Sequence, residues 1–163
     1  MHENNSAYIK DDTFKIIIEN TPLVSVDLIV KNQSKILLGK RINKPAQKYW
    51  FTLGGRVLKN EKIQDALKRI AKEELGIILN TTPKFIGVFE HLYHDSIFDG
   101  VSTHYINLGY GIEVSSFDDL PKEQHTHYQW FDLDELIQND SVHHYVKDYF
   151  SLEQGTVPNN KQE

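Results

Sequence analysis

The chain carries, at residues 55–77, the stretch GRVLKNEKIQDALKRIAKEELGI, and this stretch decides the fold. Apolar residues recur in it at three- and four-residue intervals from Ile63 to Leu75, which is the spacing of one face of an α-helix. Gly76 follows at once, at the position where a glycine commonly ends a helix. The pattern therefore predicts an amphipathic helix over Glu61–Leu75 that packs against the rest of the protein by its apolar face.

One carboxylate interrupts this apolar face. On a helical wheel of about 100° per residue, Glu74 falls about 20° from Ile63, in the middle of the stripe. An ionised carboxylate facing the core is costly unless a partner compensates it, and either a buried arginine or a divalent cation would do so. Gly54 and Gly55 lie just upstream and favour the cation, because glycines let backbone carbonyls approach a metal or a phosphate closely.

Segments typical of strands and of helices alternate along the rest of the chain. The expected strands are 23–31, 35–41, 85–93, 103–114 and 128–131, and further helices are expected to open at residue 132 and to span 142–150. The segment 14–19 contains three isoleucines and fits either a short helix or a strand. This mixed order predicts an α/β sandwich with a mixed sheet rather than a parallel doubly wound sheet.

Length and composition exclude several classes of protein. A chain of 163 residues that is 39% hydrophobic and 25% charged indicates one globular domain, 1–163, with an ordered core from about residue 13 to 154. The absence of cysteine excludes a disulfide scaffold, a cysteine nucleophile and a thiolate metal site, and it suits a reducing compartment. No apolar run approaches the roughly 20 residues of a membrane span, and the start lacks a signal-peptide core. We therefore expect a cytoplasmic protein that binds no membrane.

The charge is distributed unevenly. The net charge of −5 argues against a nucleic-acid binder, yet residues 35–72 hold 11 of the 18 basic residues and only two acidic ones. Most of these lysines are expected on a solvated surface. A concentrated positive field also suits a small anionic ligand such as a phosphate ester. The charge count alone leaves both interpretations open.

The spacing within residues 55–77 resembles the Nudix box, G-x5-E-x7-R-E-U-x-E-E-x-G-U, in which U is apolar. Eight of the nine specified positions fit when Ala71 counts as the small apolar one, and the exception is Ile70, where the box has a glutamate. The resemblance implies a Nudix α/β/α sandwich and a Mg2+-dependent hydrolase (Mn2+ is an alternative) for a nucleoside diphosphate linked to another group. The missing carboxylate favours one metal ion per site over a cluster.

Other segments resemble one branch of that family, the GDP-mannose mannosyl hydrolases. The similar segments are 21–27, 37–41, 45–51, 54–57, 103–105 and 123–125, within a match over about 14–149. That branch has a degenerate box, with which Ile70 is compatible, whereas Leu53 stands where the branch usually has proline. The resemblance implies hydrolysis of GDP-mannose, or of GDP-glucose, to GDP and free sugar by inverting attack of water at the anomeric carbon. It also implies a homodimer.

The resemblance further implies the roles of individual residues. The metal ligands would be the Gly54 carbonyl, Glu74 and Gln124, and His125 would be the general base. Arg41, Arg56 and Tyr105 would contact the diphosphate, Asp27 the sugar and Phe14 the guanine, while Arg69 would either hold phosphate or orient the box glutamates. Residue type alone allows an exposed Asp27, an ordinary apolar anchor at Phe14 and surface positions for the other histidines, with His91 and His127 as the main competitors of His125.

Two other functions stay open on the sequence. A conventional Nudix pyrophosphohydrolase would give GMP and sugar 1-phosphate, and the lost carboxylate at Ile70 argues against its multi-metal site. A non-catalytic module that binds nucleotide sugars would leave Gln124 and His125 without a role.

Overall fold

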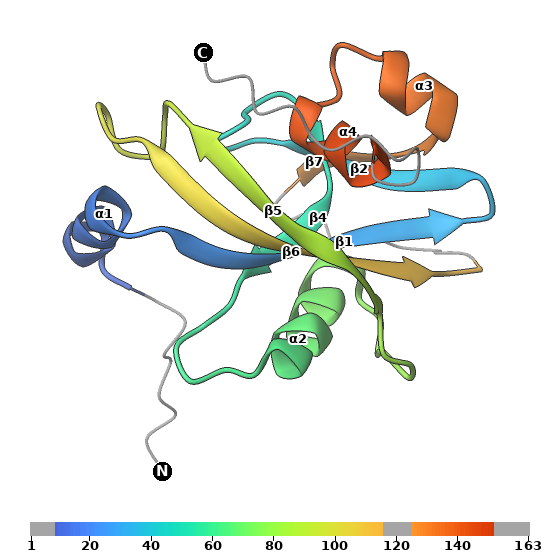
Figure 1. The fold of residues 1–163 in the computed structure, drawn as a ribbon, viewed down its shortest axis with the longest axis horizontal. Coiled ribbons are helices and arrows are strands. Elements are labelled where there is room, and N and C mark those ends of the chain that lie inside the picture. Colours follow the sequence, from blue (N-terminus) through green and yellow to red (C-terminus); the bar gives the residue numbers. More distant parts are fainter. Residues whose placement is uncertain (1–8, 116–124, 152–163) are drawn as a thin grey trace.

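The computed structural model describes residues 9–115 and 125–151, and of His125 and Thr126 the backbone only. The elements in chain order are α1 (Asp11–Asn20), β1 (Leu23–Asn32), β2 (Lys35–Arg41), β3 (Trp50–Phe51), β4 (Leu53–Arg56), α2 (Ile63–Leu75), β5 (Lys84–Tyr93), β6 (Thr103–Glu113), β7 (His125–Asp132), α3 (Leu133–Gln138) and α4 (His144–Ser151). Figure 1 shows them in one compact arrangement of sheet and helices. The described part holds no helix with the length and hydrophobicity that crossing a membrane requires.

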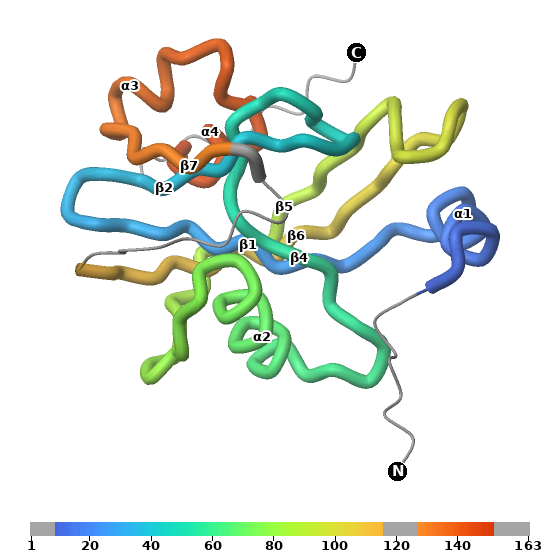
Figure 2. Tube along the Cα trace, turned by 180° about the vertical axis from the view of Figure 1, so that it is seen from behind, coloured from blue at the N-terminus to red at the C-terminus, as the bar shows by residue number. Residues whose placement is uncertain are grey.

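The strands form a mixed sheet with the order β3-β2-β1-β6-β5, to which β4 and β7 add on β1 and β2. β1 runs parallel to β6, and every other pairing is antiparallel. β1 changes partner along its length: residues 25–28 pair with β4, whereas residues 30–32 pair with β2. β2 and β4 therefore follow different stretches of β1, as the trace in Figure 2 shows.

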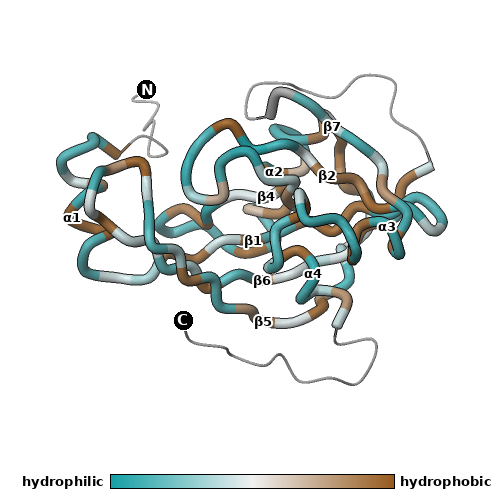
Figure 3. Tube along the Cα trace, turned by 90° about the horizontal axis from the view of Figure 1, so that it is seen from above, coloured by the Kyte–Doolittle hydropathy of each residue, from teal (hydrophilic) through white to brown (hydrophobic). Residues whose placement is uncertain are grey.

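Helices cover both faces of the sheet, with α2 on one side and α3 and α4 on the other (Figure 1). Alternate residues of β1 supply the two cores: Val26 and Leu28 pack with α2, whereas Ile29 packs with α4. Full burial of one such side chain stabilises the fold by about 1.5–3 kcal/mol. Hydrophobic and hydrophilic residues accordingly alternate along the strands and helices (Figure 3), and the predicted α/β/α sandwich with a mixed sheet is confirmed.

The central helix ends where the sequence predicts. Gly76 follows Leu75 with a φ of 68°, and its N–H donates to the carbonyls of Ala71 and Lys72. The helix begins at Ile63 rather than at Glu61, because the Glu61 carboxylate accepts a hydrogen bond from the Leu58 N–H and so belongs to the preceding turn.

Two other elements differ from expectation. The segment 14–19 is helical, and its helix, α1, already begins at Asp11, within the polar start that the sequence places outside the ordered core. β7 begins at His125, three residues before the expected strand 128–131, because it continues to pair with β2 as far as Arg41.

Candidate active site

A cleft of about 420 Å³ lies beside the part of β1 that pairs with β4, where Ser25 and Asp27 line it. Its wall combines residues from the sheet, from α2 and from the turn that joins β4 to α2. It brings together seven of the residues that the sequence singles out: Asp27, Arg41, Gly54, Arg56, Arg69, Glu74 and Tyr105. These residues are spread over nearly 80 positions of the chain, so their convergence follows from the fold and not from proximity in sequence.

Glu74 lies on the cleft side of α2 and is only 3% exposed. The Glu74 carboxylate acts on Tyr128 of β7. Burial and this neighbouring negative charge together raise the pKa of Tyr128 to about 12. The predicted carboxylate in the apolar stripe is therefore buried between α2 and the strand that starts at His125.

Gly54 lies opposite Asp27 in the β1–β4 pairing. A Cβ atom on Gly54 would come within 2.4 Å of the Val26 carbonyl oxygen and 2.6 Å of Asp27 Oδ1. Both distances are shorter than real contacts allow, so no side chain fits at this position. The close approach that the glycine permits is between β4 and β1.

Ile70, the departure from the box, is 1% exposed and packs against Gly55. A Cβ on Gly55 would lie 3.3 Å from both Cδ1 and Cγ1 of Ile70. The apolar side chain thus fills the space beside the glycine pair, at the wall of the cleft.

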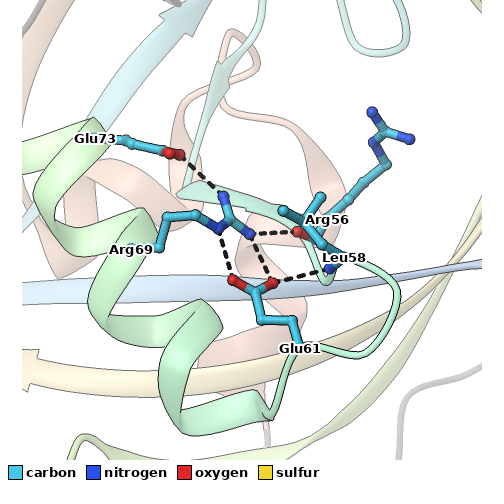
Figure 4. A network of polar contacts seen from close by, with 5 residues as sticks. All are labelled: Arg56, Leu58, Glu61, Arg69 and Glu73. Atoms are coloured by element: carbon cyan, nitrogen blue, oxygen red, sulfur yellow. Dashed lines mark hydrogen bonds and ion pairs between the residues drawn. The ribbon is translucent and has the colours of Figure 1, made fainter. Parts of the chain in front are cut away.

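Arg69 binds three groups at once (Figure 4). Its Nε and one terminal nitrogen donate to the two oxygens of Glu61, at 2.7 and 3.0 Å. The same terminal nitrogen donates to the Arg56 carbonyl at 2.9 Å, and the other donates to Glu73 at 3.0 Å. The hydrogen bond and charge of Arg69 lower the pKa of Glu61. Of its two predicted roles, this geometry favours the orienting one over direct contact with phosphate.

Asp27 is buried, at 5% exposed, so the exposed position that its residue type allows is wrong. Tyr149 Oη donates a hydrogen bond to Asp27 Oδ2. Burial raises the pKa of Asp27 to about 6, although Tyr149, Asn107, Thr52 and the positive charge of Arg41 all act to lower it. The carboxyl group is therefore held inside the protein at the inner end of the cleft.

Arg41 is fixed by its own loop, since its Nε donates to the Pro45 carbonyl at 2.8 Å and its guanidinium lies over the Phe51 ring. Tyr105 lines the same cleft, and burial raises the pKa of its phenol, so it stays protonated and can donate a hydrogen bond. Two arginines and a phenol that can donate are groups suited to a diphosphate.

Phe14 is not among the residues that line the cleft. The Arg56 guanidinium carbon is 4.3 Å from the centre of its ring, and Phe98 meets the ring edge-on at 6.1 Å. Its packing with Ile18, Leu23 and Val101 fits the apolar anchor that its residue type allows. Stacking on guanine stays a prediction.

Two histidines that we expect on the surface are buried instead. His91 is 1% exposed and stacks on Tyr145 at 4.2 Å, and His143 is 8% exposed among aromatic rings. Burial lowers the pKa of each to about 3, so both are neutral. His91 lines the cleft, and its Nε2 has no hydrogen-bond partner among the described residues.

Asn107 is a further cleft residue, one that the sequence does not single out. Its side-chain amide donates to Ser25 Oγ at 2.6 Å, and it also lines the cleft.

Of the remaining predicted residues, Gln124 lies outside the described residues. His125 is the first residue of β7, where its backbone pairs with Arg41 of β2. The start of β7 is therefore adjacent to a strand end that supplies one of the cleft arginines.

The donors in the cleft fit a hard divalent cation. The Glu74 carboxylate and the Gly54 peptide both border the cleft, and oxygen is the donor that Mg2+ prefers. Within the part of the chain that the structure describes, three or more His, Asp or Glu side chains nowhere gather as a metal cage.

The sequence profile of the NUDIX domain matches residues 21–151, so the chain belongs to the Nudix family of hydrolases. The enzymes of this family generally use a divalent metal such as Mg2+ or Mn2+. The low-salt glycan biosynthesis protein Agl8 of Haloferax volcanii is 39% identical over 143 residues, which are 86% of this chain and 88% of that protein. The ADP-ribose pyrophosphatase of Methanocaldococcus jannaschii is 31% identical over 147 residues, 90% and 83% of the two chains. The crystal structure of a MutT Nudix hydrolase from Burkholderia pseudomallei superimposes with a TM-score of 0.66 at 28% identity, covering 84% of this chain and all of that one.

Proposed function

We propose that this Nudix hydrolase cleaves GDP-mannose, or GDP-glucose, to GDP and the free sugar, with water attacking the anomeric carbon and inverting it. One observation carries the proposal: one cleft is lined by two unlike sets of groups. The first set is the arginines and the glutamates of α2, and the second is the buried Asp27 carboxyl with neutral polar groups. A nucleotide sugar has the same division between its charged diphosphate and its neutral sugar.

The first set of groups, the arginines and the glutamates of α2, would bind the diphosphate and its metal ion. Arg41 and Arg56 would pair with phosphate oxygens and stabilise the charge that grows on the leaving group, and Tyr105 would donate a hydrogen bond to it. Gly54, Glu74 and Gln124 would hold Mg2+, which when bound neutralises diphosphate charge and makes GDP a better leaving group. Arg69 would act indirectly, by fixing Glu73 and the turn that carries Arg56.

The second set of groups, Asp27 with the neutral polar side chains, would bind the sugar. Asp27, with a pKa of about 6, is ionised at neutral pH, and a negative carboxylate favours positive charge at the anomeric carbon. Asn107 and His91 are both buried at the cleft wall. The Asn107 side chain and the Nε2 of His91 are neutral polar groups to which sugar hydroxyls could hydrogen-bond. His91 is a poor candidate for the base, since a pKa of about 3 leaves its nitrogen too weakly basic.

His125 would take the proton from the attacking water. An imidazole with an ordinary pKa near 6.5 is a suitable base near neutral pH, and such catalysis is typically worth about 10²–10⁴-fold. The position of its backbone at the start of β7, paired with Arg41, supports a role beside the arginines of the cleft.

Product identification tests the proposal. The protein is incubated with GDP-mannose and Mg2+ in water enriched in ¹⁸O, and the nucleotide and sugar products are separated. We expect GDP and a labelled free sugar, with a loss of turnover in His125→Ala of about 10²-fold or more. GMP in place of GDP, or label in phosphate, would overturn the assignment. Turnover at the wild-type rate in His125→Ala would remove this residue as the base.

A second candidate is a Nudix pyrophosphohydrolase, which would attack phosphorus. The Methanocaldococcus relative favours it, because that protein is named an ADP-ribose pyrophosphatase. Ile70 argues against it, since the cleft lacks the carboxylate at this position that a multi-metal site would use. A panel of ADP-ribose, GDP-mannose and GDP-glucose, with the products identified, separates the two candidates.

We also propose a single domain, a cytoplasmic location and a homodimer. Light scattering coupled to size-exclusion chromatography measures the oligomeric state, and a mass near the 18.9 kDa of one chain would contradict the dimer.

A further inference from the structure

Tyr149 lies on α4, the last helix of the described chain, yet its hydroxyl donates to the carboxylate of Asp27 on β1. We propose that Tyr149 is a positioning residue, whose hydroxyl fixes the orientation of the Asp27 carboxylate toward the sugar of a bound nucleotide sugar. The inference rests on the proposed function only in assigning Asp27 to the sugar.

Both groups of this contact are buried. Tyr149 is 2% exposed and Asp27 is 5% exposed, so water has little access to either group. The Tyr149 ring packs edge-on against Phe89 on β5, with ring centres 4.4 Å apart. The ring is thus held by packing while its hydroxyl donates to Oδ2 of Asp27.

The sheet leaves room for the Tyr149 ring at one position. Gly109 on β6 lies directly opposite Asp27 in the parallel pairing of β1 and β6. A Cβ on Gly109 would lie 2.9 Å from Cε1 and 3.2 Å from Cδ1 of Tyr149, and 3.2 Å from Phe89 Cε2. The missing side chain at Gly109 therefore admits the ring that reaches Asp27.

Gly54 bounds Asp27 on its other side. It is the β4 partner of Asp27, and a Cβ there would lie 2.6 Å from Oδ1. Asp27 thus has a glycine on each neighbouring strand, with one carboxylate oxygen beside Gly54 and the other bonded to Tyr149. This slot fixes the carboxylate from both sides, which is the precision that contact with a reacting sugar requires.

A purely structural role for Tyr149, as an anchor of α4, is the alternative. Tyr145 provides the matched control, because it is also a tyrosine on α4 and its hydroxyl makes two 2.8 Å hydrogen bonds to the Leu92 backbone, away from Asp27. If both tyrosines only anchor the helix, removal of either hydroxyl will lower stability and leave the chemical step alone.

The test compares Tyr149→Phe with Tyr145→Phe in steady-state kinetics on GDP-mannose, together with thermal unfolding and the binding of GDP. We expect Tyr149→Phe to lower kcat by about tenfold, as loss of one buried hydrogen bond to a charged group allows. The Kd for GDP should be unchanged, because GDP lacks the mannosyl group that Asp27 is proposed to contact. Tyr145→Phe should keep the wild-type kcat. A wild-type kcat in a folded Tyr149→Phe, or an equal loss in both variants, overturns the inference.

A double-mutant cycle connects the effect to Asp27. In an Asp27→Asn background, Tyr149→Phe should lower kcat no further, because the group that it positions is already altered. A full additional tenfold loss in the double mutant would show that Tyr149 acts elsewhere and would overturn the inference.

Gly109→Ala perturbs the same ring without touching its hydroxyl. It should lower kcat in the same direction as Tyr149→Phe, whereas Gly111→Ala on the same strand should not, since a Cβ there has only ordinary contacts at 3.7 and 3.9 Å. An unchanged kcat in Gly109→Ala would contradict the inference that the missing side chain at Gly109 admits the Tyr149 ring and so helps to position Asp27. If this variant does not fold, Tyr149→Phe and the cycle decide alone.

The proposed function is tested separately by the wild-type products. Absence of GDP and free sugar from the wild-type reaction would end the proposed function. With those products present, a normal Tyr149→Phe would end only the positioning role.

Discussion

Arg69 binds both carboxylate oxygens of Glu61, at 2.7 and 3.0 Å, and so ties the middle of α2 to the turn that precedes the helix. Glu61 also accepts from the Leu58 N–H, and Arg69 also donates to the Arg56 carbonyl. Figure 4 shows that these contacts close a ring around the 56–61 turn. The turn carries Arg56 to the cleft, so its rigidity bears on the site.

Replacing Arg69 by lysine should lower stability. Lysine cannot reproduce the paired hydrogen bonds of the guanidinium, and loss of charge-assisted bonds of this kind costs about 1–3 kcal/mol. Urea unfolding of Arg69→Lys measures the free energy of unfolding. The control is Lys15→Gln, which breaks an exposed ion pair with Glu19 at 3.7 Å and should cost no more than about 0.5 kcal/mol. Equal losses in the two variants would show that the Arg69 network is no stronger than a surface pair.

Glu74→Gln should weaken the response to Mg2+ and lower the rate together. The amide keeps the shape of the buried side chain but removes the negative charge that attracts a divalent cation. Activity is titrated with Mg2+, and binding of Mn2+ is followed independently by water proton relaxation. Asp65→Asn removes an exposed carboxylate from the same helix and serves as the control. Mg2+ and Mn2+ titrations that coincide with the wild type would remove Glu74 as a ligand.

Local patterns predict the elements whose determinants lie within a few residues. The helical spacing and Gly76 predict α2, and alternation predicts β1 and β2, because each of these signals acts over less than twenty residues. The β7 boundary could not be found in this way. The polar residues around His125 join a strand because β2, more than 80 positions earlier, offers a pairing partner.

The same distinction between local and distant determinants applies to the residues of the candidate site. Glu74 could be singled out because its own helix shows it in an apolar stripe. The burial of Asp27 could not, since it is enclosed by Tyr149, which lies 122 positions along the chain. The sequence marks His91 as a competitor of His125 but does not predict its burial. An imidazole on a strand is buried or exposed according to the helix that covers it, here through Tyr145 of α4.

The two buried histidines should make the protein less stable in acid. In the folded state His91 and His143 have pKa values of about 3, whereas in the unfolded chain the value is near 6.5, so between these values the unfolded state binds more protons. Stability therefore falls as the pH drops below about 6.5. From pH 7.5 to pH 5 each imidazole should cost about 2 kcal/mol. Asp27 opposes this with about 1 kcal/mol, because its pKa is raised to about 6 in the folded state.

Urea unfolding of His143→Asn at the two pH values checks this. Asparagine can still accept the hydrogen bond from the Tyr145 N–H that His143 Nδ1 accepts at 3.3 Å, but it does not titrate. We expect the acid-induced loss in this variant to be about 2 kcal/mol smaller than in the wild type. His94→Asn removes an exposed imidazole and should retain the full wild-type loss. Equal losses in all three proteins would contradict a neutral, buried His143.

Ile70→Glu restores the residue that the Nudix box specifies, and we expect it to destabilise the protein. Ile70 is 1% exposed and packs on Gly55. The new carboxylate would replace apolar contacts, and the groups that make those contacts cannot hydrogen-bond to it. Ile70→Val should cost about 0.5–1.5 kcal/mol and Ile70→Ala about 2–5 kcal/mol, because they remove increasing volume without adding charge. At pH 7.5 without metal, Ile70→Glu should cost at least as much as Ile70→Ala, and the loss should shrink on addition of Mn2+ if the carboxylate can reach a cation in the cleft. Stability equal to that of the wild type would mean that the wall beside Gly55 already accommodates a carboxylate, and the packing of Ile70 would then not explain the departure from the box.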